Sequence, residues 1–173
     1  MLLCLVGSEM CIRDSVNPVY SSDIAKGKEL SVSCAACHGE NGISLNPVWP
    51  KLAGQNPKYL ASQLYEFRKG AEGNRNNAVM YGIAMTLSDS DIEDLSAYYA
   101  SLESKVGLTQ DKYLDLGRNI YRGGNMEIKI QACISCHGPN GQGNYAAAIP
   151  MLSGQHSQYT YQQLKNFQAS VRS

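Results

Sequence analysis

The chain has 173 residues, of which 15 are basic and 15 acidic, so its formal net charge at pH 7 is zero. This length suits one ordinary domain or two small ones, and the balanced charge gives no basic surplus for binding nucleic acid. No apolar run approaches the ~20 residues of a membrane-spanning helix. Only two Phe and one Trp are present, and a domain of ~80 residues buries little apolar surface. We therefore expect a non-protein group to complete the interior.

Residues 1–15, "MLLCLVGSEMCIRDS", are set apart from the rest of the chain. They begin with a short apolar stretch, but no positive charge precedes it and the charged residues Glu9 and Arg13 come soon after it, so the segment fails as a signal peptide. The segment resembles translated sequencing-adapter DNA. We interpret it as a non-native or leader segment and assign no functional role to Cys4 and Cys11.

Residues 20–103 are predicted to form a small helical domain. The pattern of apolar and capping residues predicts three helices, over residues 24–33, 57–68 and 89–102. Their starts carry capping residues, namely Ser22 or Asp23 for the first, Asn56 followed by Pro57 for the second, and Ser88 with Asp91 for the third. Because no alternating strand pattern competes, the fold class is predicted to be all-α.

A linker is predicted over residues 104–113 and a second domain over residues 114–173, and the helical stretch "YLDLGRNIYRGG" begins at the junction of the two. Further on, "PMLSGQHSQYTYQQLKNF" repeats the earlier "PKLAGQNPKYLASQLYEF", with Pro, Leu, Gly, Gln, Tyr, Gln, Leu and Phe recurring in order. A repeat this long indicates two copies of one fold rather than a solenoid. The chain ends before a counterpart of the third helix, so we expect the second copy to be incomplete.

Each copy also contains the motif Cys-x-x-Cys-His-Gly, in "SCAACHGENG" and in "ACISCHGPNG". The repeat aligns Cys34, Cys37 and His38 with Cys133, Cys136 and His137. A thioredoxin-like redox pair would follow a strand, and none is predicted here. A zinc site built from two cysteine pairs usually has them ~15–20 residues apart, and it gives no reason for a histidine at this position.

Covalent haem attachment explains every position of the motif. Two residues between the thiols let both sulfurs reach the two vinyl groups of one porphyrin edge, and the next residue, His, binds the iron. The sequence therefore predicts two haem c groups, attached through the four motif cysteines, with His38 and His137 as iron ligands.

The ligand on the other face of each iron decides the chemistry. A side chain that closes this face makes an electron carrier, whereas an open face binds small molecules or catalyses a reaction. Met80 and Met85 are the candidates in the first copy. Met80 lies in "GNRNNAVMYG", which we predict to be an irregular loop that folds over the haem edge, while Met85 is close to the Ser88 cap and is assigned to packing. We predict that Met80 binds the first iron.

The segments "CAACHGENG", "PKLAGQNPKYLASQL" and "MYGIAMTLSDSDIEDLSAYYASL" resemble the two-haem cytochrome c4 family, which is built from class I cytochrome c domains. The resemblance covers Ile24 to Ser173. It implies two tandem class I domains, with His38 and Met80 on the first iron and His137 on the second. It also implies that a proline carbonyl accepts a hydrogen bond from His38 Nδ1–H, which would orient the ring. Pro47 is our candidate for this acceptor, the alternative being a plain turn residue.

By the same alignment, the methionine expected to close the second iron falls beyond the last residue. Met126, Met151 and His156 are the remaining candidates, and local packing or helix capping is the default role of each. We therefore expect the sixth ligand of the second haem to be missing from this chain, and we interpret the chain as a C-terminally truncated product of a longer gene.

These features favour a periplasmic electron carrier, because covalent haem attachment takes place outside the bacterial cytoplasm. One haem would accept an electron from a respiratory donor complex, and the other would pass it on, by family analogy toward a terminal oxidase. The alternatives are a haem enzyme and a cytochrome subunit of a larger dehydrogenase. Only three His are present, and two are assigned to iron, which argues against an enzyme. We expect no nucleic-acid partner and no transmembrane segment, although the family suggests loose association with the membrane surface.

Overall fold

The structure is a computed structural model that describes residues 21–107 and 111–172. Residues 1–15, interpreted above as a non-native or leader segment, lie outside the described residues, as do positions 108–110 of the predicted linker. The helices are α1 (Ile24–Leu30), α2 (Val32–His38), α3 (Pro57–Arg68), the 3-10 turn η1 (Gly70–Glu72), α4 (Ala78–Ala84), α5 (Asp89–Ser101), α6 (Asp111–Gly123), α7 (Ile134–His137) and α8 (Ser157–Gln168). Apart from two isolated bridges, the described residues form no strand. The prediction of an all-α fold is confirmed.

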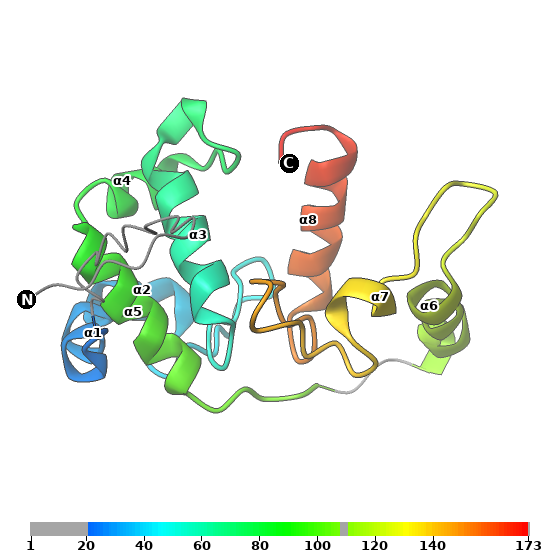
Figure 1. The fold of residues 1–173 in the computed structure, drawn as a ribbon, viewed down its shortest axis with the longest axis horizontal. Coiled ribbons are helices and arrows are strands. Elements are labelled where there is room, and N and C mark those ends of the chain that lie inside the picture. Colours follow the sequence, from blue (N-terminus) through cyan, green and yellow to red (C-terminus); the bar gives the residue numbers. More distant parts are fainter. Residues whose placement is uncertain (1–20, 108–110, 173) are drawn as a thin grey trace, which may run out of the picture.

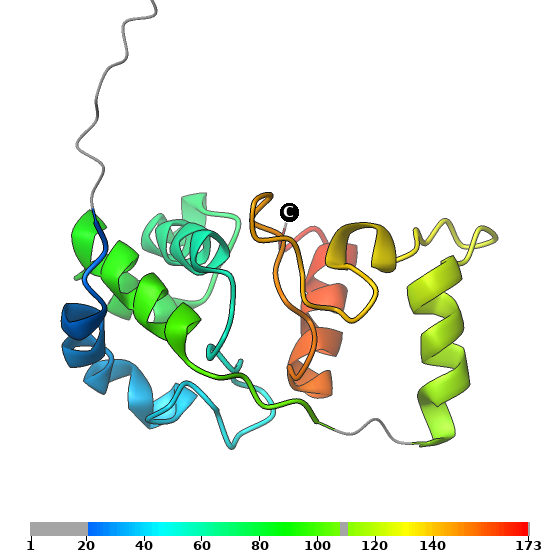
Figure 2. The ribbon, with the colours of Figure 1, turned by 60° about the horizontal axis from the view of Figure 1, so that its bottom comes forward.

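The helices fall into two groups that follow the two copies of the repeat. Helices α1 to α5 lie on one side and α6, α7 and α8 on the other, and the segment after α5 connects them (Figures 1 and 2). In the first group α5 packs on α1 and α3, and α3 also packs on α4. Helix α6 already begins at Asp111, inside the stretch that was predicted to be a linker.

The helix starts of the first copy follow the predicted caps. The side chains of Asp23 and Asn56 accept hydrogen bonds from backbone N–H groups in the first turns of α1 and α3. Ser88 and Asp91 form a complete capping box at the start of α5. These bonds satisfy amide groups that have no partner inside the helix, and each cap contributes about 1 kcal/mol.

Two details of the predicted helices were wrong. The helix predicted over residues 24–33 is divided at Ser31, because the Ser31 hydroxyl donates to the Lys28 carbonyl at 2.7 Å and so competes with the regular helical pattern. The stretch around Met80, predicted to be irregular, contains α4, because the Asn77 side chain accepts a hydrogen bond from Met80 N–H at 3.0 Å. Met80 therefore lies on a capped helix.

The apolar core of the described residues lies in the first copy. Helix α1 approaches α5 so closely that a Cβ on Gly27 would lie 2.1 Å from the Asp94 carbonyl oxygen. Burial of one large apolar side chain stabilises a fold by about 1.5–3 kcal/mol. The buried apolar residues are Ala53, Leu60, Ala61, Phe67, Ala84, Ile92, Leu95, Tyr98 and Tyr99.

The second copy leaves its apolar side chains uncovered. None of those on α6, α7 and α8 is buried. Phe167 is 46% exposed, whereas its counterpart Phe67 is 8% exposed. A Cβ on Gly117 of α6 would meet nothing within 4 Å. This copy therefore has apolar surface that a non-protein group could cover, as the composition led us to expect.

Candidate haem sites

The first motif lies on α2, which directly follows α1. Cys34 and Cys37 are three residues apart on this helix, so their half-buried thiols share one face. His38 is the last helical residue, and Gly39 follows with φ +79°, a conformation that favours glycine. A Cβ on Gly39 would lie 2.5 Å from the Ile43 carbonyl oxygen. The glycine of the motif is therefore needed for the chain to turn back after His38.

His38 is held in one orientation and one protonation state. The residue is 8% exposed, and its Nδ1–H donates to the Pro50 carbonyl at 2.8 Å. Burial lowers the pKa of His38 below its ordinary value, and the bond to Pro50 opposes this with a smaller effect, so the ring is neutral at pH 7. With the proton on Nδ1, the free lone pair is on Nε2, which is the form of histidine that binds metal ions.

The second motif repeats this geometry at α7. Cys133 is the N-cap residue, and Cys136 and His137 lie on the helix. His137 Nδ1–H donates to the Pro150 carbonyl at 2.8 Å. Gly138 ends the helix at φ +75°, as Gly39 does in the first copy. Both copies thus present two thiols beside a histidine that a proline carbonyl orients.

The acceptor of His38 is Pro50 and not Pro47, so that prediction was wrong. Pro47 lies in an exposed loop, whereas backbone hydrogen bonds close the loop just after Pro50 and bring its carbonyl beside the ring. The repeat contained the necessary signal, because Pro50 recurs as Pro150 while the position of Pro47 is occupied by Ala147 in the second copy.

The residues of both motifs fit haem c. Their thiols are spaced for the two vinyl groups of a porphyrin, and a histidine follows directly. Among residues 21–107 and 111–172, no group of three or more His, Cys, Asp or Glu side chains could hold a metal ion, so these residues do not gather the ligands of a structural zinc site. The uncovered apolar surface of the second copy is the kind of surface that packs on a porphyrin.

Burial and existing contacts separate the candidates for the sixth ligand. Met80 is half-buried on α4, whereas Met85 at the end of this helix is 56% exposed. Met126 is 86% exposed. His156 Nε2–H donates to the Ser44 carbonyl of the other copy at 2.9 Å, so this nitrogen is already engaged. Of the two methionine candidates for the first iron, Met80 is therefore the less exposed.

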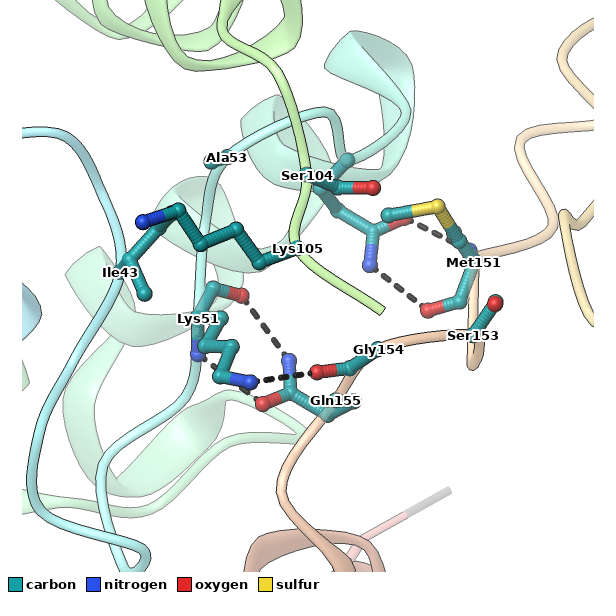
Figure 3. Close-up of a pocket in the computed structure, with 10 residues that line it drawn as sticks. Ile43, Lys51, Ala53, Ser104, Lys105, Met151, Ser153, Gly154 and Gln155 are labelled. Carbon is teal, nitrogen blue, oxygen red and sulfur yellow. Dashed lines mark hydrogen bonds between the residues drawn. The ribbon is translucent and has the colours of Figure 1, made fainter. Parts of the chain in front are cut away.

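The loops that follow the two motifs meet at the contact between the copies. Gln155 Oε1 accepts from Lys51 N–H at 2.9 Å, and Gln155 Nε2 donates to the Lys51 carbonyl at 2.9 Å (Figure 3). Gln55 makes the same pair of bonds to the backbone of Met151, at 2.7 and 2.9 Å. This reciprocal pattern is that of a two-fold symmetric interface. The recurrence of the glutamine was visible in the sequence, but its role was not predicted.

Two arginines at the same contact lack an acidic partner among residues 21–107 and 111–172. Arg75 stacks on Phe67 of its own copy and donates to the Tyr159 hydroxyl of the other copy at 3.2 Å. Arg172 donates to the Tyr59 hydroxyl at 2.7 Å and is only 9% exposed. No carboxylate among the described residues pairs with either guanidinium. Because a buried charge is costly without a counter-charge, the buried Arg172, together with the half-buried Arg75, fits an anionic group such as the haem propionates.

Covalent haem is the group that uses both thiols and the adjacent histidine, and the site occurs twice in an all-helical chain. The class is therefore that of two-haem c-type cytochromes, and the relatives of this chain within the class, reported below, are electron-transfer proteins and not enzymes. A profile of the family described as cytochrome c matches residues 24–103 and 117–173.

Known proteins narrow this class. Cytochrome c4 from Thiocapsa roseopersicina is 44% identical over 140 residues, which cover 80% of this chain and 71% of that protein. The crystal structure of reduced recombinant cytochrome c4 from Pseudomonas stutzeri is similar with a TM-score of 0.85 and 38% identity, covering 88% of this chain and 84% of that one. The thiosulfate dehydrogenase electron acceptor from Thiomonas intermedia is 38% identical over 148 residues, which cover 83% of this chain and 66% of that protein. The chain belongs to the cytochrome c4 family, and its cofactors are haem c groups.

Proposed function

We propose that this two-haem electron carrier works in the bacterial periplasm, where it takes electrons from a respiratory donor complex and passes them toward a terminal oxidase. The observation that carries the proposal is the pair of equivalent histidine sites whose loops bond directly to each other, which supports two redox centres close together in one chain. Covalent haem attachment supports the location. None of the helices in the described part of the chain is long and apolar enough to span a bilayer.

Haem c would supply an iron that alternates between Fe(II) and Fe(III), while the chain binds it and tunes its potential. Pro50 and Pro150 would orient the histidines, and Arg75 and Arg172 would take the propionate carboxylates. The sixth ligand of the second iron remains unassigned. We assign the thioether bonds and iron ligands to Cys34, Cys37, His38 and Met80 in the first copy and to Cys133, Cys136 and His137 in the second.

Carbon monoxide binding to the reduced, haem-loaded chain tests the closed first iron that a carrier needs. We expect Met80→Ala to bind one more CO per molecule than the unaltered chain, because the replacement removes the thioether that closes this iron. Met85→Ala, which removes the exposed methionine five residues along the chain, is the matched control and is expected to bind no more CO than the unaltered chain. Binding at both haems of the unaltered chain would contradict the Met80 assignment and favour a haem enzyme.

A second candidate function is to accept electrons from a dehydrogenase that oxidises small sulfur compounds. The likeness to a thiosulfate dehydrogenase electron acceptor favours it. The two candidates share the haem sites and differ in the protein that reduces them, so both agree with the geometry described above.

A further inference from the structure

One peptide group connects the iron-binding histidine of the first copy to the second copy. The carbonyl of Pro50 accepts the bond from His38 Nδ1–H at 2.8 Å. The N–H of this same peptide group belongs to Lys51, and it donates to Gln155 Oε1 at 2.9 Å (Figure 3). Because the C=O and N–H of a peptide group share one resonance system, the two hydrogen bonds are electronically connected.

The opposite direction has an equivalent chain of bonds. The carbonyl of Pro150 accepts from His137 Nδ1–H at 2.8 Å, and the N–H of the same peptide group, that of Met151, donates to Gln55 Oε1 at 2.7 Å. Each copy therefore contributes one glutamine to the peptide group that holds the histidine of the other copy.

Both glutamines are fixed by further bonds. Oε1 of Gln55 also accepts from Asn56 N–H at 2.9 Å, and Oε1 of Gln155 accepts from His156 N–H at 2.9 Å. Each Nε2 donates to the backbone carbonyl across the contact, and Gln55 is only 6% exposed. With three bonds apiece, these amides have one allowed orientation, and their oxygens point at the proline peptides.

Such a chain of hydrogen bonds affects the iron through the histidine. Bonds in a chain polarise one another by about 10–30% each. An acceptor on the peptide N–H makes the proline carbonyl a stronger acceptor for Nδ1–H, and a stronger bond at Nδ1 makes Nε2 a better electron donor. A better donor stabilises Fe(III) more than Fe(II), because Fe(III) carries the larger positive charge. The reduction potential of that haem is therefore lowered.

We infer that Gln155 and Gln55 are positioning residues, each of which tunes the haem of the opposite copy. Gln155 acts through Pro50 on His38, and Gln55 acts through Pro150 on His137. The inference rests on the proposed function, in which both histidines bind iron. It makes the contact between the copies an electronic connection as well as a packing contact, because docking completes the hydrogen-bond chain at both histidines.

The test replaces each glutamine with methionine, which has a similar length but offers neither the oxygen acceptor nor the N–H donor. The haem-loaded full chain is titrated for the reduction potential of each haem, and the Nδ1–H proton of each histidine is followed by NMR in the reduced state. We expect Gln155→Met to raise the reduced-to-oxidised ratio of the first haem at a fixed ambient potential, on the order of two- to threefold. The His38 proton should move toward the position of a weaker hydrogen bond, with His137 unchanged. Gln55→Met should shift the second haem and the His137 proton in the same way, with His38 unchanged.

The control is His156→Leu, which removes the bond from His156 to the Ser44 carbonyl across the same contact and leaves both proline peptides untouched. We expect it to move neither ring proton. The inference is overturned if both methionine variants shift the two haems alike, as general loosening would do, or if neither shifts the haem of the opposite copy. Iron ligation is checked separately by the hyperfine-shifted ring signals of both histidines in the oxidised, unaltered chain. Their absence would reject the proposed function whatever the glutamine variants do.

Discussion

At the scale of single residues, the arginines at the contact are charged groups that the described part of the chain does not neutralise. Arg75 and Arg172 both donate to Gln63 Oε1, at 2.6 and 3.0 Å, so neutral oxygens are their acceptors. Arg68, in contrast, pairs with Asp89 at 2.6 Å. Since the cost of burying a charge is offset by an opposite charge, the unpaired arginines support the assignment of the propionates to this region.

Replacement of Arg172 by glutamine tests this assignment. We expect Arg172→Gln to lower the reduction potential of the nearer haem, because loss of a positive charge close to the iron favours Fe(III) over Fe(II). Arg68→Gln changes the net charge by the same amount at a site that already has a carboxylate partner, and it is expected to have a smaller effect. Spectroelectrochemical titration of the haem-loaded variants measures both. Equal shifts from the two variants would indicate a general charge effect and reject the assignment.

Prediction from sequence is most specific for residues whose chemistry lies in their own side chains. The paired cysteines and the histidine of each motif are predicted to hold haem because no common alternative uses that set of groups at that spacing. The acceptor of His38 was assigned to the wrong residue because every residue has a carbonyl, and the path of the loop decides which one reaches the ring. Gln55 and Gln155 were missed for a related reason, since their partners are backbone groups of the opposite copy.

At the scale of secondary structure, the crossing of α1 and α5 decides how the first copy closes. Gly27 lets α1 and α5 lie closer together than any other residue at this position would permit. A Cβ on residue 27 would collide with backbone atoms of Asp94. The predicted caps explain where α1, α3 and α5 begin. The division between α1 and α2 depends on the hydrogen bond of the Ser31 side chain to the backbone, and the start of α4 depends on that of Asn77. The pattern of apolar residues does not show which backbone group such a polar side chain will bind.

Alanine substitution at the glycines of α1 and α6 tests this crossing. Gly27→Ala should destabilise the haem-loaded chain by about 2–3 kcal/mol, because the rigid backbone of α5 must move to admit the methyl group. Gly117→Ala is the control, since its Cβ would meet nothing within 4 Å, and it should be neutral or stabilising by about 0.5–1 kcal/mol through helix propensity. Urea unfolding followed by circular dichroism gives both values. A Gly27 variant as stable as the Gly117 variant would show that the close approach is absent in solution.

At the scale of the whole molecule, the two copies are alike in their motifs and unlike in their packing. The reciprocal bonds at the contact are related by the repeat, including those of Asn56 to the Asn144 carbonyl and of His156 to the Ser44 carbonyl. The sequence predicted the duplication from aligned segments, but it could not predict that the aligned loops would face each other. Aligning one copy on the other shows which residues are equivalent. It does not show where the two copies lie relative to each other, and the contact between them depends on that placement.

The unequal packing predicts unequal local stability in the haem-loaded chain. Helix α5 buries Ile92, Leu95, Tyr98 and Tyr99, whereas α6 buries none of its side chains. Opening α5 exposes several large apolar groups at about 1.5–3 kcal/mol each, so its amides should exchange with solvent at least about 100-fold more slowly than those of α6. Hydrogen exchange followed by mass spectrometry, corrected for intrinsic rates, compares peptides from the two helices. Equal protection would contradict this prediction and would mean that α6 is covered in the haem-loaded chain, so that the second copy has a core of its own that includes its haem.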